Sequence, residues 1–198
     1  MLNLPNFLTL IRIATIPLFL LLLFARHYTW ALVVFAFGGL TDALDGPVAR
    51  WTKQRTRLGA YLDPMADKML IISSLVVLTY IGATPGWLTI LVLSRDLIIT
   101  LGYGAIYFWI QQKMEILPSF MGKANTFLLL LTITVVLVSL HDPDMIPDVA
   151  VPVGPFKFYV MDSLFVLTSV TTVISGLQYV YRGLVWLQER VSPPTRAS

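Results

Sequence analysis

The stretch from Asp63 to Ile110 decides the fold, and it reads DPMADKMLIISSLVVLTYIGATPGWLTILVLSRDLIITLGYGAIYFWI. It holds two long, largely apolar segments, residues 63–83 and 87–110, separated by Thr84-Pro85-Gly86. A helix needs roughly 20 apolar residues to cross the hydrocarbon core of a bilayer. A Pro-Gly pair between two such segments indicates a tight turn. The stretch therefore predicts two transmembrane helices joined by a short turn.

The composition of the 198-residue chain points the same way. Hydrophobic residues make up 57% and charged residues only 13%, and the mean hydropathy is +0.77. Soluble domains are nearer half apolar and a quarter charged, so this composition excludes a water-soluble enzyme and a disordered chain. The absence of cysteine excludes a disulfide scaffold, thiol catalysis and thiolate metal sites. The net charge of +3 is too small to indicate a nucleic-acid partner.

Six segments of the chain qualify, or nearly qualify, as membrane spans. They are residues 7–25, 30–50, 63–83, 87–110, 126–140 and 158–181, and the fifth is short unless it begins near Gly122. Arg26-His27 closes the first segment, and a proline-rich loop occupies residues 142–155. We therefore expect an all-α polytopic membrane protein, a six-transmembrane-helix bundle. Residues 1–183 would form one domain and residues 184–198 a short cytoplasmic tail.

The lysines and arginines between these segments predict the orientation of the bundle. If the N-terminus is cytoplasmic, nine basic residues lie on its side: Arg50, Lys53, Arg55, Arg57, Lys113, Lys123, Arg182, Arg190 and Arg196. The opposite loops carry only Arg26 and Lys157. Cytoplasmic loops carry the excess of basic residues, so both termini are expected in the cytoplasm. The predicted location is the inner membrane of a bacterial cell.

Eight charged residues fall within or beside the apolar segments: Arg12, Asp42, Asp45, Asp63, Asp67, Lys68, Arg95 and Asp96. A charge at membrane depth costs a few kcal/mol or more, so such residues usually face the interior of the bundle and serve function. Four of the acids lie in one window, residues 42–67. This window is therefore the first candidate for a site.

Helical spacing brings these four carboxylates together in pairs. Asp42 and Asp45 are three residues apart and share a face of the second helix. Asp63 and Asp67 are four residues apart on the third helix, where we expect Asp63 to be the N-cap and Pro64 the first helical residue. The polar connection between the two helices is short, so the helices run antiparallel. The two pairs should then converge in one pocket.

Four carboxylates in a low-dielectric pocket need compensating positive charge. Ligands that are all oxygen, without cysteine or clustered histidine, favour Mg²⁺ or Mn²⁺ over Zn²⁺. Two such ions would orient a diphosphate, and Arg50, one turn beyond Asp45, could neutralise phosphate. The pattern predicts a two-metal phosphoryl-type transfer. Alternatively, the acids form salt bridges at helix ends, with these partners: Arg50, Arg55, Arg57 and Lys68.

The spacing D-x2-D-G-x2-A-R-x8-G-x3-D-x3-D resembles the signature of the CDP-alcohol phosphatidyltransferases at every fixed position. The positions are Asp42, Asp45, Gly46, Ala49, Arg50, Gly59, Asp63 and Asp67. Residues 3–12, NLPNFLTLIR, are similar to the amino-terminal segment of that family. Six helices match as well, so the resemblance covers nearly the whole chain.

The resemblance implies a reaction and a set of roles. A phosphatidyl group would pass from CDP-diacylglycerol to an alcohol, with release of CMP, in an enzyme that is usually a homodimer. It implies that the four aspartates ligate two divalent cations, Mg²⁺ or Mn²⁺, and that Asp67 is also the general base. The residues implied to line the nucleotide site are Gly46, Ala49, Arg50 and Gly59. A carboxylate suits the role of base because an alcohol is a poor nucleophile until its proton is removed.

The acceptor alcohol depends on the fourth and fifth segments. Residues 174–183 resemble two branches of the family, phosphatidylglycerophosphate synthases, which use glycerol 3-phosphate, and cardiolipin synthases, which use phosphatidylglycerol. The first branch tends to carry a lysine where Asn125 stands, and Arg-Glu where Arg95-Asp96 stands. Losing one cation weakens the case for a doubly charged acceptor. We expect Arg95, Lys123 and Asn125 to form the acceptor site, for a glycerol-type alcohol rather than inositol phosphate or serine.

The same charged residues are also compatible with purely structural roles. Arg95 and Asp96 could neutralise neighbouring charges, Arg12 could pair with an intramembrane acid, and Lys123 could extend to the membrane surface. Among other classes of protein, a membrane prenyltransferase needs two aspartate motifs far apart in sequence. An ion or proton transporter also uses intramembrane carboxylates, but it usually shows inverted repeats, and this sequence shows none.

Overall fold

The computed structural model describes residues 4–51, 57–110, 119–145, 150–153 and 156–191. Within these ranges only the backbone path is described at residues 4–8, 42–51, 57–63, 107, 109–110, 150–153, 156–158 and 189–191. Side chains are described at the remaining residues.

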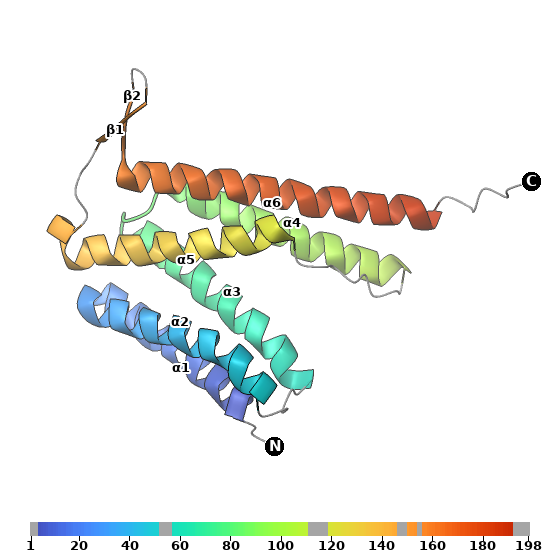
Figure 1. Cartoon of the computed structure of the whole chain (residues 1–198), viewed down its shortest axis with the longest axis horizontal. Helices are drawn as coiled ribbons and strands as arrows, with labels where there is room; N and C mark the ends of the chain where they lie inside the picture. Colours follow the sequence, from blue (N-terminus) through green and yellow to red (C-terminus); the bar gives the residue numbers. More distant parts are fainter. Residues whose placement is uncertain (1–3, 52–56, 111–118, 146–149, 154–155, 192–198) are drawn as a thin grey trace, which may run out of the picture.

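Six long helices make up most of the described chain (Figure 1). They are α1 (Leu4–Phe24), α2 (Tyr28–Trp51), α3 (Arg57–Tyr80), α4 (Gly86–Ile110), α5 (Phe120–His141) and α6 (Val160–Val191). The six predicted segments each correspond to one of them, so the expectation of a helical chain with six long helices is confirmed. The fifth helix begins before Gly122, which gives it the length that residues 126–140 alone would lack.

The turns between helices fall where the sequence predicted them. Arg26 adopts a left-handed conformation (φ 57°) two residues after the end of α1, and Gly82 does the same (φ 79°) two residues after the end of α3. A left-handed residue here ends a helix by letting the chain turn back, so that its own amide and the next one donate to carbonyls of the last turn, as Arg26 donates to Leu23 and Gly82 to Thr79 at 3.0 Å. The proline-rich segment contains a 3₁₀ turn, η1 (Pro143–Met145), and a small antiparallel hairpin, β1 (Ala150–Val153) with β2 (Phe156–Tyr159).

The helices pack in two groups. α1 packs against α2 and α3, and α6 packs against α4 and α5, while α2 and α3 contact α5 and α3 also contacts α4. Between them lies one apolar core, and its fully buried members come from five helices: Phe19, Leu23, Ala31, Leu75, Leu78, Leu88, Ile133 and Leu137. Figure 1 shows that the beginnings of α1 and α3 and the ends of α2, α4 and α6 point toward the right-hand side of the view. The motif residues of α2 and α3 therefore lie at the same end of the molecule as the end of α4.

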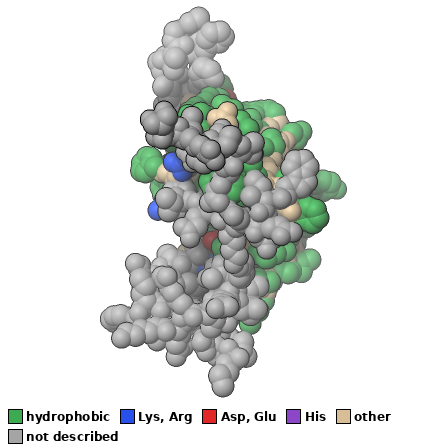
Figure 2. Space-filling model, turned by 90° about the vertical axis from the view of Figure 1, so that its right-hand side faces the viewer, with side chains coloured by type: hydrophobic (Ala, Val, Ile, Leu, Met, Phe, Trp, Pro, Cys, Tyr) green, Lys and Arg blue, Asp and Glu red, His purple; other side chains and the backbone are tan. Residues whose placement is uncertain are grey.

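The distribution of polarity suits a lipid environment. Large apolar side chains lie on the outside, with Phe108 80% and Phe120 81% exposed, whereas Arg12 and a series of threonines and serines are buried. Figure 2 views the right-hand end of Figure 1, and apolar side chains cover most of its coloured surface. A protein in water rarely exposes apolar patches on this scale. Within the described residues, three helices are long and apolar enough to cross a membrane, at residues 86–106, 120–141 and 160–188.

Two boundaries differ from the prediction. α3 begins at Arg57, so Asp63 is not an N-cap and Pro64 lies inside the helix. A proline inside a helix removes one backbone hydrogen bond, and α3 nevertheless continues through Pro64 to Tyr80. α6 runs to Val191, beyond the end of the predicted segment 158–181, and the division into a domain of residues 1–183 and a cytoplasmic tail of residues 184–198 stays a prediction.

Candidate functional site

The motif residues lie on two consecutive helices. Asp42, Asp45, Gly46, Ala49 and Arg50 fall in the last part of α2, and Gly59, Asp63 and Asp67 in the first part of α3. Both parts lie at the same end of the molecule, where the chain passes from α2 to α3 (Figure 1). Apart from Asp67, the side chains of these residues lie outside the part that the structure describes, so their contacts stay predictions.

Asp67 is the motif residue whose surroundings are described. Its side chain is 41% exposed, and Nη1 of Arg12 donates a hydrogen bond of 2.7 Å to its Oδ1. Arg12 lies in α1 with no exposed side-chain surface, and the neighbouring Thr15 donates to the Arg12 carbonyl at 2.7 Å. A hydrogen bond between two charged groups is shorter and stronger than a neutral one. Arg12 therefore fixes one oxygen of Asp67, while the carboxylate keeps access to solvent.

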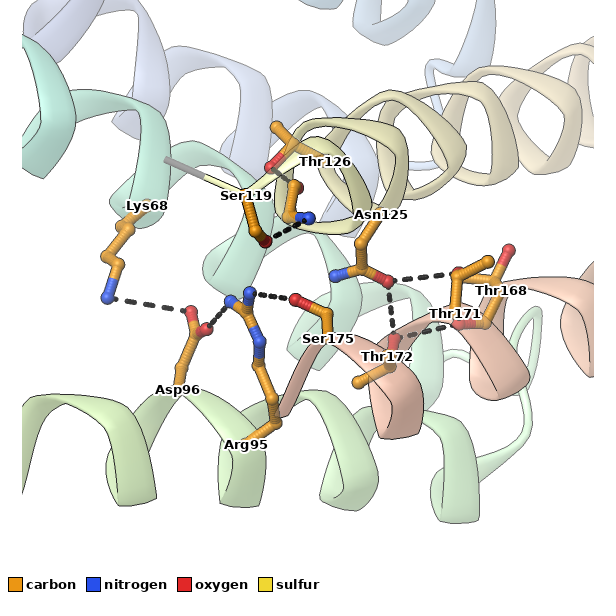
Figure 3. Close-up of polar contacts among 11 residues, drawn as sticks. Lys68, Arg95, Asp96, Ser119, Asn125, Thr126, Thr168, Thr171, Thr172 and Ser175 are labelled. Carbon is orange, nitrogen blue, oxygen red and sulfur yellow. Dashed lines mark hydrogen bonds and ion pairs between the residues drawn. The ribbon is translucent and has the colours of Figure 1, made fainter. Parts of the chain in front are cut away.

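The residue after Asp67 faces a different group of helices. Nζ of Lys68 lies 3.9 Å from Oδ2 of Asp96 on α4, and Nη1 of Arg95 donates to Oδ1 of the same carboxylate at 2.6 Å. Nη2 of Arg95 donates to Oγ of Ser175 on α6 at 2.7 Å. Figure 3 shows these four side chains in a row from α3 through α4 to α6. Polar side chains from three helices thus converge one residue beyond the motif.

Two of the three predicted acceptor residues contact α6. Arg95 contacts Ser175, and Asn125, which is 1% exposed, accepts hydrogen bonds at Oδ1 from Thr171 (3.2 Å) and Thr172 (2.8 Å). These α6 residues lie within about one helical turn of each other. Asn125 therefore holds α5 to α6, close to the point where Arg95 reaches α6. Lys123, the third predicted residue, is exposed at the start of α5.

Sequence reasoning did not identify the partners of these charges. Arg12 was expected to pair with some intramembrane acid, but the sequence could not say which, because Asp67 is 55 residues away. The roles of Lys68, Ser175 and Tyr179 were also missed. A usable signal existed: Thr168, Thr172, Ser175 and Tyr179 recur every three or four residues, which is the spacing of one helix face.

The chemistry of the donor set fits hard divalent cations. The motif offers four carboxylates, the chain has no cysteine, and neither histidine falls in the motif segment, so oxygen-preferring ions such as Mg²⁺ or Mn²⁺ suit it better than Zn²⁺. Among the described side chains there is no cluster of three or more histidines, aspartates or glutamates. Asp67 is the one proposed ligand with a described side chain, and its partial exposure leaves it accessible to an ion.

Comparisons with known proteins agree with the motif. The family model described as CDP-alcohol phosphatidyltransferase matches residues 2–180. A Mycobacterium tuberculosis protein named "Probable phosphatidylglycerophosphate synthase" is 36% identical over 191 residues, which covers 92% of this chain and 82% of that protein.

Cardiolipin synthases are similar as well. A Streptomyces coelicolor protein named "Cardiolipin synthase (CMP-forming)" is 37% identical over 144 residues, covering 70% of this chain and 66% of its own. The human protein of the same name is 32% identical over 201 residues, covering 91% of this chain and 62% of its own. Relatives with two different products are thus about equally similar in sequence.

Proposed function

Since this chain belongs to the CDP-alcohol phosphatidyltransferase family, we propose that its two-helix aspartate motif binds CDP-diacylglycerol through two divalent cations and transfers the phosphatidyl group to a glycerol-type alcohol. The chain is an enzyme of phospholipid biosynthesis. The family match over residues 2–180 carries this conclusion, and it replaces the transporter and prenyltransferase alternatives.

The reaction requires one bond to form and one to break. The acceptor hydroxyl oxygen attacks the phosphorus that carries diacylglycerol, and the bond from this phosphorus to the CMP oxygen breaks. The proton of the hydroxyl goes to the Asp67 carboxylate. The 41% exposure of Asp67 supports this role, since a base must be reachable by its substrate. The hydrogen bond from Arg12 fixes the orientation of that carboxylate.

The proposed metal ligands are Asp42, Asp45, Asp63 and Asp67. Bound there, Mg²⁺ or Mn²⁺ would neutralise charge on the diphosphate and on the departing CMP. The proposed nucleotide-site residues are Gly46, Ala49, Arg50 and Gly59, where small side chains allow close approach and Arg50 can pair with phosphate.

The acceptor is proposed to bind beside Arg95. This guanidinium lies on α4, and Lys68 near it follows directly after Asp67 in sequence, so an anionic acceptor held here would lie close to the proposed base. The candidates are glycerol 3-phosphate, giving phosphatidylglycerophosphate, and phosphatidylglycerol, giving cardiolipin.

The decisive experiment incubates purified protein with CDP-diacylglycerol and each of glycerol 3-phosphate, phosphatidylglycerol and inositol phosphate, and identifies the lipid formed by mass spectrometry. Formation of product with inositol phosphate alone would contradict the glycerol-type assignment.

Asn125→Lys tests the choice between the two glycerol-type acceptors. If the neutral residue at 125 disfavours a doubly charged acceptor, lysine there should raise kcat/KM for glycerol 3-phosphate relative to phosphatidylglycerol, by about tenfold for one added charge contact. Asn125→Met is the matched control, because it loses the same hydrogen bonds to Thr171 and Thr172 without adding charge. If the ratio of kcat/KM for glycerol 3-phosphate to kcat/KM for phosphatidylglycerol is the same in both variants, the residue at position 125 does not select the acceptor.

We propose that the motif end of the bundle and both termini face the cytoplasm, in six crossings of a bacterial inner membrane. The basic segments of the sequence follow α2 and α4, whose ends lie on the motif side of the bundle, and this supports the orientation. The chain has no cysteine, so a single introduced thiol reports its own accessibility. In intact cells a membrane-impermeant maleimide should label Asp144→Cys, and it should label Ser198→Cys only after permeabilisation. The reverse pattern would invert the topology.

The proposed assembly is a homodimer, as the resemblance implies. Light scattering of the purified protein, corrected for detergent, should give twice the 22.2 kDa chain mass. A monomer mass with full transfer activity would contradict it.

A further inference from the structure

The Arg95 side chain is held by α6 from two sides. Oγ of Ser175 accepts from Nη2 at 2.7 Å, and the ring of Tyr179, one turn further along α6, lies under the guanidinium with 5.5 Å from its Cζ to the ring centroid. An arginine within about 6 Å of an aromatic centroid is attracted to the ring face. Together the two contacts fix both the direction and the plane of the guanidinium.

Asp96 is the third residue that contacts the Arg95 guanidinium, but its single negative charge does not neutralise both Arg95 and Lys68. The single carboxylate is shared between Nη1 of Arg95 and Nζ of Lys68. Two cations and one anion leave an excess of positive charge among these three residues. Among the described residues, Nε of Arg95 has no hydrogen-bond partner. A cation with a spare donor, in a net positive cluster, is suited to an anionic ligand.

Two glycines make room for this arrangement. A Cβ on Gly176 would lie 3.2 Å from Cγ of Arg95, and a Cβ on Gly122 would lie 3.0 Å from Oη of Tyr179. Both distances are tighter than ordinary van der Waals contact, so a methyl group would displace either the Arg95 stem or the Tyr179 ring. The absence of side chains at Gly122 and Gly176 therefore permits the observed positions of Tyr179 and Arg95.

The face of α6 that carries these contacts is fixed against α5. Thr172 donates to Asn125, and Thr168 and Thr132 share a hydrogen bond of 2.8 Å, all at buried positions. Hydrogen bonds between membrane helices contribute modestly to their association, and each of these restrains the rotation of α6 about its axis. Ser175 and Tyr179 are consequently presented to Arg95 in one register.

We propose that Ser175 and Tyr179 are positioning residues that orient the Arg95 guanidinium toward the phosphate or phosphodiester of the acceptor. This inference rests on the proposed acceptor role of Arg95. It assigns acceptor recognition to α6 as well as to α4 and α5. The two residues do not touch the reacting atoms, so they act on acceptor binding and leave donor binding and the chemical step nearly unchanged.

The experiment compares steady-state constants for the two substrates. Each variant is assayed with CDP-diacylglycerol and, in separate series, glycerol 3-phosphate and phosphatidylglycerol. Ser175→Ala should raise the KM for the acceptor about five- to fiftyfold, as expected for losing a hydrogen bond to a charged group. The KM for CDP-diacylglycerol should stay within about twofold, because neither Arg95 nor Ser175 is among the proposed donor-site residues. Gly176→Ala should also raise the acceptor KM, since its methyl group displaces the Arg95 stem.

Matched variants separate positioning from packing. Ser169→Ala is the control on the same helix, because its hydroxyl donates only to the Val166 carbonyl of α6 in the described contacts. Tyr179→Leu should raise the acceptor KM several-fold, whereas Tyr179→Phe keeps the aromatic face and should restore it. In an Arg95→Met background, Ser175→Ala should have little further effect, since the interaction it removes is already absent.

The outcomes distinguish this inference from the proposed function. If Arg95→Met leaves the acceptor KM unchanged, the proposed acceptor role of Arg95 is wrong. If Arg95→Met raises that KM but Ser175→Ala, Gly176→Ala and Tyr179→Leu all match Ser169→Ala, the acceptor role stands and the positioning role is wrong. A change confined to the KM for CDP-diacylglycerol, or an equal change in both KM values, would also overturn the positioning role.

Discussion

Asp67→Asn is expected to lower kcat for phosphatidyl transfer by about 10²–10⁴-fold, the usual contribution of a general base. The asparagine amide has nearly the shape of the carboxylate but cannot take the proton of the acceptor hydroxyl. Asp67 is also a proposed metal ligand, so the loss should lie toward the upper end of this range. The measurement is steady-state transfer by purified protein at saturating donor and acceptor.

The Asp67→Asn protein should remain folded, and Arg12 supplies the reason. Asparagine keeps an Oδ1 that can accept the hydrogen bond from Arg12, so the contact between α1 and α3 persists in neutral form. Thermal unfolding in detergent should therefore shift by only a few degrees. Asp162→Asn is the matched control, since this exposed acid lies in the first turn of α6 away from the motif. Wild-type turnover in Asp67→Asn would show that another group is the base.

Removing divalent cations is expected to abolish transfer. Four carboxylates need positive charge to be ionised close together, and the CDP diphosphate adds further negative charge to the same place. With excess EDTA, activity should fall below about 1% of its starting value, consistent with the several kcal/mol that a metal ion supplies to such a transition state. Adding Mg²⁺ or Mn²⁺ beyond the chelator should restore it.

A control distinguishes loss of the ion from loss of the fold. The helices are built from apolar segments whose core lies away from the motif end, so the far-ultraviolet circular dichroism should be unchanged by EDTA. Full transfer activity after exhaustive chelation would refute the two-metal proposal. Restoration by Zn²⁺ in preference to Mg²⁺ would contradict the inference from oxygen ligands.

The helical fold was predictable because its signals are local. The length of each apolar segment predicts the length of its helix, and Thr84-Pro85-Gly86 indicates where the chain turns. The error in the predicted start of α3 also came from a local signal. Asp63-Pro64 has the sequence of a helix start, but α3 begins at Arg57 and continues through Pro64. A signal of two residues was therefore not enough to place the boundary of the helix.

The site was predictable only in part. The motif gives the aspartates by spacing alone, because positions three or four apart must share a helix face. The partners of the charges depend on which helices are neighbours, which periodicity does not encode. Arg12 meets Asp67, Arg95 meets Ser175 and Asn125 meets Thr172 across separations of 46 residues or more. Such pairings become visible only when the helices are packed.

The division of the bundle into two groups of helices separates two tasks. All eight motif positions lie on α2 and α3, which pack with α1, whereas Arg95, Asn125, Ser175 and Tyr179 lie on α4, α5 and α6. On the proposed assignments, the first half of the gene encodes the activation of the lipid donor and the second half encodes the choice of alcohol. Evolution could then change the product by substitutions in the second half alone. Chimaeras joined at Gly82, in the turn between the halves, would be the natural way to exchange one phospholipid product for another.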